Sequence, residues 1–110
     1  MTHHMRLHPL PFELIQTGRQ KIETRVYDEK RRKIAVGDTI EFSLRTDPEK
    51  KFEVKIIELV LRKTFSELFD AYPAEFFGGT NKEELMRIYK YYTKKEETEF
   101  GVVGIMLEVV

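Results

Sequence analysis

The sequence contains no cysteine, and its basic and acidic residues are equal in number at 19 each. The absence of cysteine excludes a disulfide-stapled secreted scaffold and a cysteine-ligated zinc or iron–sulfur module. No apolar run approaches the ~18 residues of a membrane-spanning helix. Zero formal net charge removes the simplest argument for nucleic-acid binding, so any such function must rest on local charge.

Amide side chains are scarce as well, since only Gln16, Gln20 and Asn81 are present. Few amides beside abundant Lys and Glu is a composition typical of hyperthermophiles. The N-terminal segment lacks the basic-then-apolar order of a secretory signal, so we expect a cytoplasmic protein. Eight Phe and five Tyr are too many for a disordered chain, and 110 residues suit one domain spanning 1–110.

Alternating apolar residues and turn signals predict an α+β fold with several strands and two or three short helices. Pro11 suits the first turn of a helix, Thr64 or Ser66 can cap a second, and Asn81 with Glu84 can cap a third. A last strand that pairs with an early one would form a small barrel, although the composition is equally compatible with an open sheet. The expected strands are 5–10, 21–27, 39–44, 52–61 and 100–110, and the expected helices are 11–17, 64–72 and 81–92.

The strand expected at 21–27 has one apolar and one charged face, because side chains alternate along a strand. Glu23 and Arg25 therefore project together. One possibility is an exposed ion pair on the surface. The other is the wall of a cleft, where the Glu23 carboxylate accepts hydrogen bonds from the edge of a base or acts as a general acid or base, and the Arg25 guanidinium binds an anion. The core face carries Ile22, Thr24 and Val26, and the opposite face carries Lys21, Glu23, Arg25 and Tyr27.

Zero net charge conceals a basic segment at 19–33, where seven basic residues outnumber three acids. Such a segment can follow a phosphate backbone, or it can be a solvated loop that prevents edge-to-edge strand pairing. The basic residues are Arg19, Lys21, Arg25, Lys30, Arg31, Arg32 and Lys33.

Motifs for nucleophilic catalysis and phosphate-binding loops are absent from the sequence. His3, His4 and His8 lack the helical spacing of a preorganised metal site and lie near a chain end. We therefore expect no metal and no cofactor.

The stretch from Phe12 to Asp28, together with Gly37-Asp38-Thr39-Ile40, resembles the ASCH domain family. The signature of that family reads G-x-K-x-x-E-x-R. Here Gly18, Glu23 and Arg25 match three of its four positions, and Gln20 occupies the lysine position. The resemblance implies a small PUA-like β-barrel with two or three short peripheral helices.

The resemblance also implies a cleft that binds RNA or a nucleotide. No membrane association is expected, and the oligomeric state is open. An alternative is a protein-interaction module in which the same cleft binds an acidic peptide or supports a homodimer. The residues expected at the site are Gly18, Arg19, Gln20, Lys21, Glu23, Arg25, Tyr27, Arg31, Arg32 and Lys33.

One branch of the family consists of amidohydrolases that remove the acetyl group from N4-acetylcytidine. Their proposed machinery is the signature lysine, a threonine and a later carboxylate. Gln20 departs from that pattern, because a neutral amide cannot replace a lysine. The remaining catalytic candidates are Lys21, Glu23 and Thr24, with Glu75, Glu83 or Glu84 as the later carboxylate.

Aromatic residues are dense in the second half of the chain. They either pack the core and cover one end of the barrel or form a stacking platform for bases. The residues in question are Phe65, Phe69, Tyr72, Phe76 and Phe77, followed by Tyr89, Tyr91 and Tyr92 in the third expected helix, where at least one must face solvent.

Overall fold

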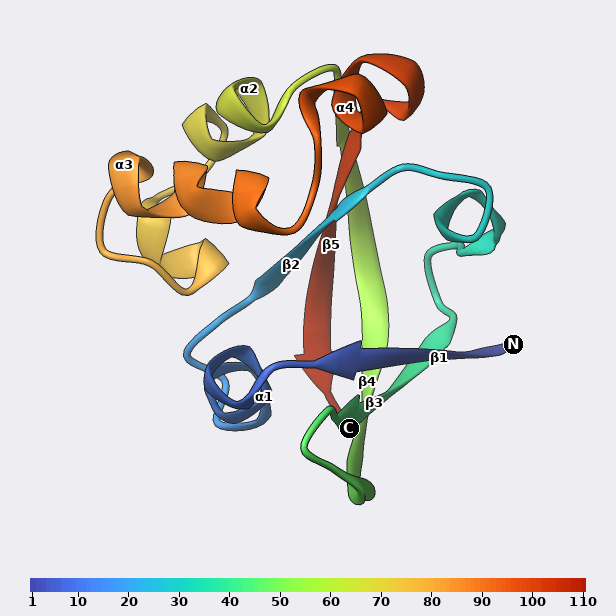
Figure 1. Cartoon of the computed structure of the whole chain (residues 1–110). Coiled ribbons are helices and arrows are strands. Elements are labelled where there is room, and N and C mark those ends of the chain that lie inside the picture. The colour runs from blue at the N-terminus through green and yellow to red at the C-terminus, as the bar shows by residue number, and fades with distance from the viewer.

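The computed structural model describes all 110 residues. One mixed five-stranded sheet curls into a half-barrel, and helices pack at its two ends (Figure 1). The strands are β1 (Thr2–Leu7), β2 (Ile22–Val26), β3 (Thr39–Leu44), β4 (Asp47–Arg62) and β5 (Val102–Val109). The α-helices are α1 (Pro9–Gln16), α2 (Phe65–Asp70), α3 (Lys82–Leu85) and α4 (Lys94–Phe100), and the 3₁₀ helices are η1 (Arg31–Lys33), η2 (Ala74–Phe77) and η3 (Met86–Lys90).

The sheet order is β1-β3-β4-β5-β2, with β1 parallel to β3 and the other pairs antiparallel. The last strand thus pairs with an early one, and the expected α+β class and barrel-like curl are confirmed. Strands β1 and β2 are the two edges of the sheet, and the curl brings both in front of β4 and β5 (Figure 1). None of the helices has the length and apolar character needed to cross a membrane.

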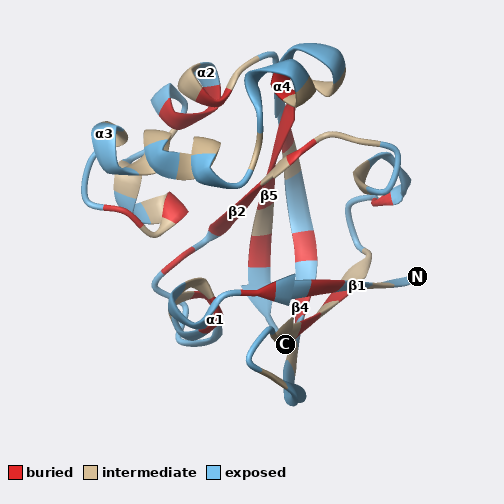
Figure 2. Ribbon diagram, in the orientation of Figure 1, coloured by how far each residue is buried: buried red, intermediate tan, exposed pale blue.

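Two apolar clusters fill the molecule, and β5 contributes to both. Val103 and Ile105 belong to the cluster beneath α1, whereas Val102 belongs to the cluster beneath α2. Because alternate side chains of β5 enter different clusters, its sequence is apolar on both faces. Figure 2 shows the resulting buried stretch on β5 and the exposed outer surfaces of the helices.

Gly104 lets helix α2 pack closely against β5, because it presents no side chain to the helix. A Cβ atom at this glycine would lie 2.9 Å from Cδ1 of Leu68 and 3.1 Å from Cγ2 of Ile22. Leu68 and Ile22 are fully buried, so neither can move into free space. The glycine therefore sets how near the helical layer comes to the sheet.

The chain after β4 is more helical than the sequence predicted. Thr64 caps α2 and Asn81 caps α3, both through side-chain oxygens that accept from backbone N–H groups. The expected helix at 81–92 is instead a single α-turn, α3, followed by η3. Helix α4 was missed, although Thr93 begins it with a capping box.

Several predicted boundaries were also wrong. Strand β1 is 2–7 rather than 5–10, and α1 starts at Pro9, whose fixed φ suits the first helical position. Strand β4 was expected at 52–61 but extends from Asp47 to Arg62 and includes Pro48, so the turn before it is at 45–46.

The buried carboxylate of Glu97 ties α4 to the other helices. Its Oε2 accepts from the backbone N–H of Phe65 and from the hydroxyl of Tyr89, both at 2.8 Å. Burial and this hydrogen bond to Glu97 raise the pKa of Tyr89 to about 12, so the phenol remains a donor at neutral pH. Helix η3, which carries Tyr89, is thereby fixed above β2.

We expect Gly104→Ala to destabilise the protein by about 1–3 kcal/mol, because the added methyl group overpacks a site with no free volume. The midpoint of urea unfolding measures the effect. Gly104→Ala combined with Leu68→Val is expected to recover part of the loss, since the valine removes the atoms that clash. An unchanged midpoint in the single variant would contradict the close approach of α2.

Candidate functional site

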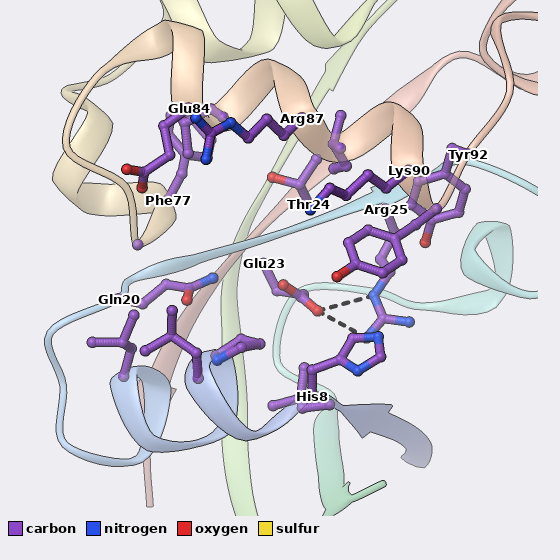
Figure 3. A pocket seen from close by; sticks show the side chains of 18 of the residues that line it. His8, Gln20, Glu23, Thr24, Arg25, Phe77, Glu84, Arg87, Lys90 and Tyr92 are labelled. Carbon is purple, nitrogen blue, oxygen red and sulfur yellow. Dashed lines mark hydrogen bonds and ion pairs between the residues drawn. The ribbon is translucent and has the colours of Figure 1, made fainter.

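Arg25 connects the two edges of the curled sheet. Its Nη2 on β2 donates to the backbone carbonyl of Arg6 on β1 at 2.9 Å. Its Nε and Nη2 also donate to Oε2 of Glu23, at 3.0 and 2.8 Å (Figure 3). The Arg25 guanidinium thus donates hydrogen bonds to both the Arg6 carbonyl and the Glu23 carboxylate at the point where β1 and β2 approach each other.

The Glu23–Arg25 pair is largely buried, with each side chain 12% exposed. Burial alone lowers the pKa of Arg25, but attraction to Glu23 and Tyr92 outweighs burial, so the pKa is raised above its ordinary value. Both Arg25 donors address the same carboxylate oxygen, and Oε1 of Glu23 has no partner in the protein. The Glu23–Arg25 pair therefore keeps one free acceptor oxygen.

This free acceptor faces a pocket of about 470 Å³, which we call the motif pocket. The pocket lies between α1 and η3 and reaches around β2 (Figure 3). Because β2 is an edge strand, side chains from both of its faces line the same space. Thr24, expected in the core, is buried but also lines the motif pocket, together with Glu23 and Arg25. The apolar wall is formed by Leu7, Leu10, Pro11, Leu14, Phe69, Phe77, Leu85 and Ile88.

Gln20 adds a second free acceptor to the motif pocket. Its amide nitrogen donates to the carbonyl of Ile22 at 2.9 Å, and its Oε1 has no partner in the protein. A Cβ atom at Gly78 would lie 2.5 Å from that oxygen, so any side chain at position 78 would collide with the Gln20 amide. The hydroxyl of Thr24 likewise makes no hydrogen bond within the protein. Three oxygens, from Glu23, Gln20 and Thr24, are thus available to a ligand.

The rim of the motif pocket is basic, although the whole chain is neutral. Arg6, Arg45, Arg87 and Lys90 line it without forming an ion pair, and Glu84 is the second acid besides Glu23. The rings of His8 and Tyr91 contact each other in a tilted arrangement, 5.1 Å between centroids, and so link the start of α1 to the end of η3. Sequence reasoning missed the four cations Arg6, Arg45, Arg87 and Lys90, since they come from strand ends and a 3₁₀ helix far apart in the chain.

Of the ten predicted site residues, four line a hollow in the structure and six do not. Gln20, Glu23 and Arg25 meet in the motif pocket, and Arg31, paired with Asp28 at 3.0 Å, lines a second hollow on the other side of Arg25. The others lie outside both hollows. Gly18 ends α1 with positive φ, Arg19 pairs with Glu13, Lys21 lies over Phe76, Tyr27 stacks with Arg32, and Lys33 is exposed.

The candidate catalytic residues are also separated. Alternation placed Lys21 on the same face as Glu23 and Arg25, but Lys21 precedes β2, lies over Phe76 and does not line the motif pocket, whereas Thr24 does. Of the three later carboxylates, Glu84 reaches the lining and Glu75 and Glu83 do not.

Most of the aromatic residues pack with one another in the cluster beneath α2. Phe65 is fully buried, and Tyr72 stacks on Phe76. Four aromatic residues also line the motif pocket, namely Phe69, Phe77, Tyr91 and Tyr92. The aromatic residues thus serve both the core and the pocket wall.

The three histidines have separate partners. His3 forms a hydrogen bond with Asp38 at 2.8 Å, His4 forms one with Glu41 at 3.2 Å, and the ring of His8 contacts that of Tyr91. No group of three potential metal ligands comes together in the structure.

A curled sheet whose edge strand carries a Glu–Arg pair into a pocket defines a PUA-like fold of the ASCH type. The model of the ASCH domain matches residues 5–110, and the chain belongs to the ASCH domain family. A crystal structure titled hypothetical protein PH0355 is 34% identical, with a TM-score of 0.88 and complete coverage of both chains. The solution structure of protein PF0455 from Pyrococcus furiosus is 33% identical, with a TM-score of 0.78, covering 100% of this chain and 98% of its own. No curated protein is significantly similar to this chain.

We expect Arg25→Lys to destabilise the protein by about 1–3 kcal/mol, because an ammonium cannot serve the Glu23 carboxylate and the Arg6 carbonyl in the same planar geometry. The chemical-denaturation midpoint reports the loss. Arg19→Lys is the matched control, since its pair with Glu13 is exposed and is expected to contribute little. Equal midpoints for the two variants would show that the bridge between the edge strands is dispensable.

Proposed function

We propose that the motif pocket binds the base of a nucleotide or of single-stranded RNA. The observation that carries this proposal is the set of three unpartnered oxygens, from Gln20, Glu23 and Thr24, inside a pocket with apolar walls. A base has two apolar faces and an edge of donors and acceptors, and this lining is complementary to both features.

The size and charge of the motif pocket support the same ligand class. Its volume of about 470 Å³ lies within the ~300–1,000 Å³ of small-molecule sites. Glu23 and Gln20 supply acceptors only, so they favour the amino and imino groups of a base edge. The unpaired cations Arg6, Arg45, Arg87 and Lys90 favour a ligand that carries phosphate over a neutral nucleoside.

Glu23→Gln is expected to weaken nucleotide binding about tenfold or more, because a hydrogen bond to a charged acceptor is replaced by one to a neutral amide. Calorimetric titration with each common ribonucleoside 5′-monophosphate measures this change. Glu13→Gln, on the exposed side of α1, is the matched control and is expected to bind as the unmodified protein does. If no monophosphate and no short RNA binds the unmodified protein, the proposal is overturned.

Amidohydrolysis of N4-acetylcytidine is a second candidate, favoured by the presence of Thr24 and Glu84 in one pocket. In that reaction water adds to the acetyl carbonyl, the C–N bond breaks, and acetate and cytidine leave. The position of the signature lysine is occupied by Gln20, whose amide nitrogen is engaged by the Ile22 carbonyl. This substitution favours binding over hydrolysis.

We therefore expect the unmodified protein to release no cytidine from N4-acetylcytidine, even at high protein concentration and long incubation. Chromatographic separation of the two nucleosides detects turnover directly. Release of cytidine that is lost in Thr24→Val would reverse this expectation and assign the enzymatic role. Gln20→Lys restores the family residue and tests whether the amide is the missing element.

A further inference from the structure

A second hollow, of about 590 Å³, lies on the other side of Arg25. We call it the basic groove. It is formed by the outward-facing side chains of β1 and β3, the first half of β4 and the segment that follows β2. Its lining contains one acid, Glu41, against six cations, which are Arg6, Arg25, Lys30, Arg31, Arg45 and Lys51.

Half of these cations have no counter-charge within the protein. Arg25 pairs with Glu23, Arg31 with Asp28, and Lys51 lies 3.8 Å from Glu41. Arg6, Lys30 and Arg45 form no ion pair. The groove thus carries a net positive charge that only an external anion can neutralise.

The electrostatics of Lys30 reflect this concentration of charge. Its pKa is lowered by burial and by repulsion from Arg31, Arg25 and Arg6. The Nε of Arg31 is also buried without a hydrogen-bond partner. The fold therefore holds these cations near one another at a cost in electrostatic free energy, and a bound anion would reduce that cost.

The basic groove and the motif pocket are adjacent and share a wall, because Arg6, Arg25 and Arg45 line both. Strand pairing explains how these side chains meet. Arg6 on β1 is opposite Ser43 on β3, and the backbone N–H of Arg45 donates to the carbonyl of Leu7 at 2.9 Å. A chain that leaves the motif pocket past this shared wall therefore meets the guanidinium groups of Arg6, Arg25 and Arg45.

We infer that the basic groove binds the phosphodiester backbone of a single-stranded nucleic acid whose base occupies the motif pocket. This inference rests on the function proposed above and specifies its ligand as an oligonucleotide rather than a mononucleotide. A single strand is required, because a base within a duplex is stacked and paired and cannot enter the motif pocket. The repeating charge of the backbone matches a groove with several cations and one acid.

The test compares oligonucleotide and mononucleotide binding in variants of the groove. Lys30→Gln/Lys51→Gln removes two cations that line the groove and not the motif pocket. Lys50→Gln/Lys63→Gln makes the same charge change at exposed positions outside both hollows. The probes are random-sequence RNA and DNA single strands of about eight nucleotides, the corresponding duplexes, and the ribonucleoside monophosphates.

The groove variant is expected to bind the single strands roughly ten- to thirty-fold more weakly at 0.1 M salt, with a salt-dependence slope smaller by about 1.4, since each phosphate contact contributes ~0.7. Its affinity for monophosphates is expected to be unchanged, and the control variant should resemble the unmodified protein. Glu41→Gln removes the one acid of the groove and should tighten binding of single strands, an effect that loss of folding cannot produce.

Equal single-strand affinity in the groove and control variants would overturn the inference, as would duplexes that bind as tightly as single strands. Failure of the proposed function has a different pattern. If the proposed function is wrong, Glu23→Gln binds every probe with the same affinity as the unmodified protein, and this holds whether or not the groove variant loses affinity for single strands.

Discussion

The guanidinium of Arg25 is the contact on which the site depends. A curled sheet with two free edges must bring β1 and β2 together without a ladder of backbone hydrogen bonds between them. Arg25 supplies the connection by donating to the Arg6 carbonyl, and Glu23 neutralises the charge that this position buries. Because burying an unpaired charge is costly, the two signature residues are needed together.

The same contact divides the concave surface into two hollows. On one side lies the motif pocket, with apolar walls and three free oxygens, and on the other lies the basic groove. A base and a phosphodiester backbone need these opposite environments at neighbouring positions. Gln20, at the position of the family's signature lysine, places a neutral amide in the pocket where a lysine would place a cation, which changes the chemistry available there.

Much of the fold could be predicted from the sequence, because alternation is a local property of strands. The strand at 39–44 matches its predicted bounds, and the last strand pairs with β2 as a barrel-like arrangement requires. Helix α4 was missed because its seven residues, mostly charged, show no apolar periodicity, so only the cap at Thr93 marks it. A helix was expected at 81–92, but its change from α to 3₁₀ geometry at Met86 was missed, because a 3₁₀ segment has nearly the same side-chain spacing as an α-helix.

The sequence by itself determined the α+β class, the family and the neighbouring positions of Glu23 and Arg25, because each of these follows from local order along the chain. Only the tertiary structure decided that Thr24 lines the same pocket as Glu23, since this requires the pocket to reach around an edge strand. It also decided which cations line the two hollows. Arg6, Arg45 and Arg87 are dispersed in the sequence, and the curl of the sheet and the packing of η3 bring them to one surface, whereas Lys33 of the basic segment lies outside both hollows.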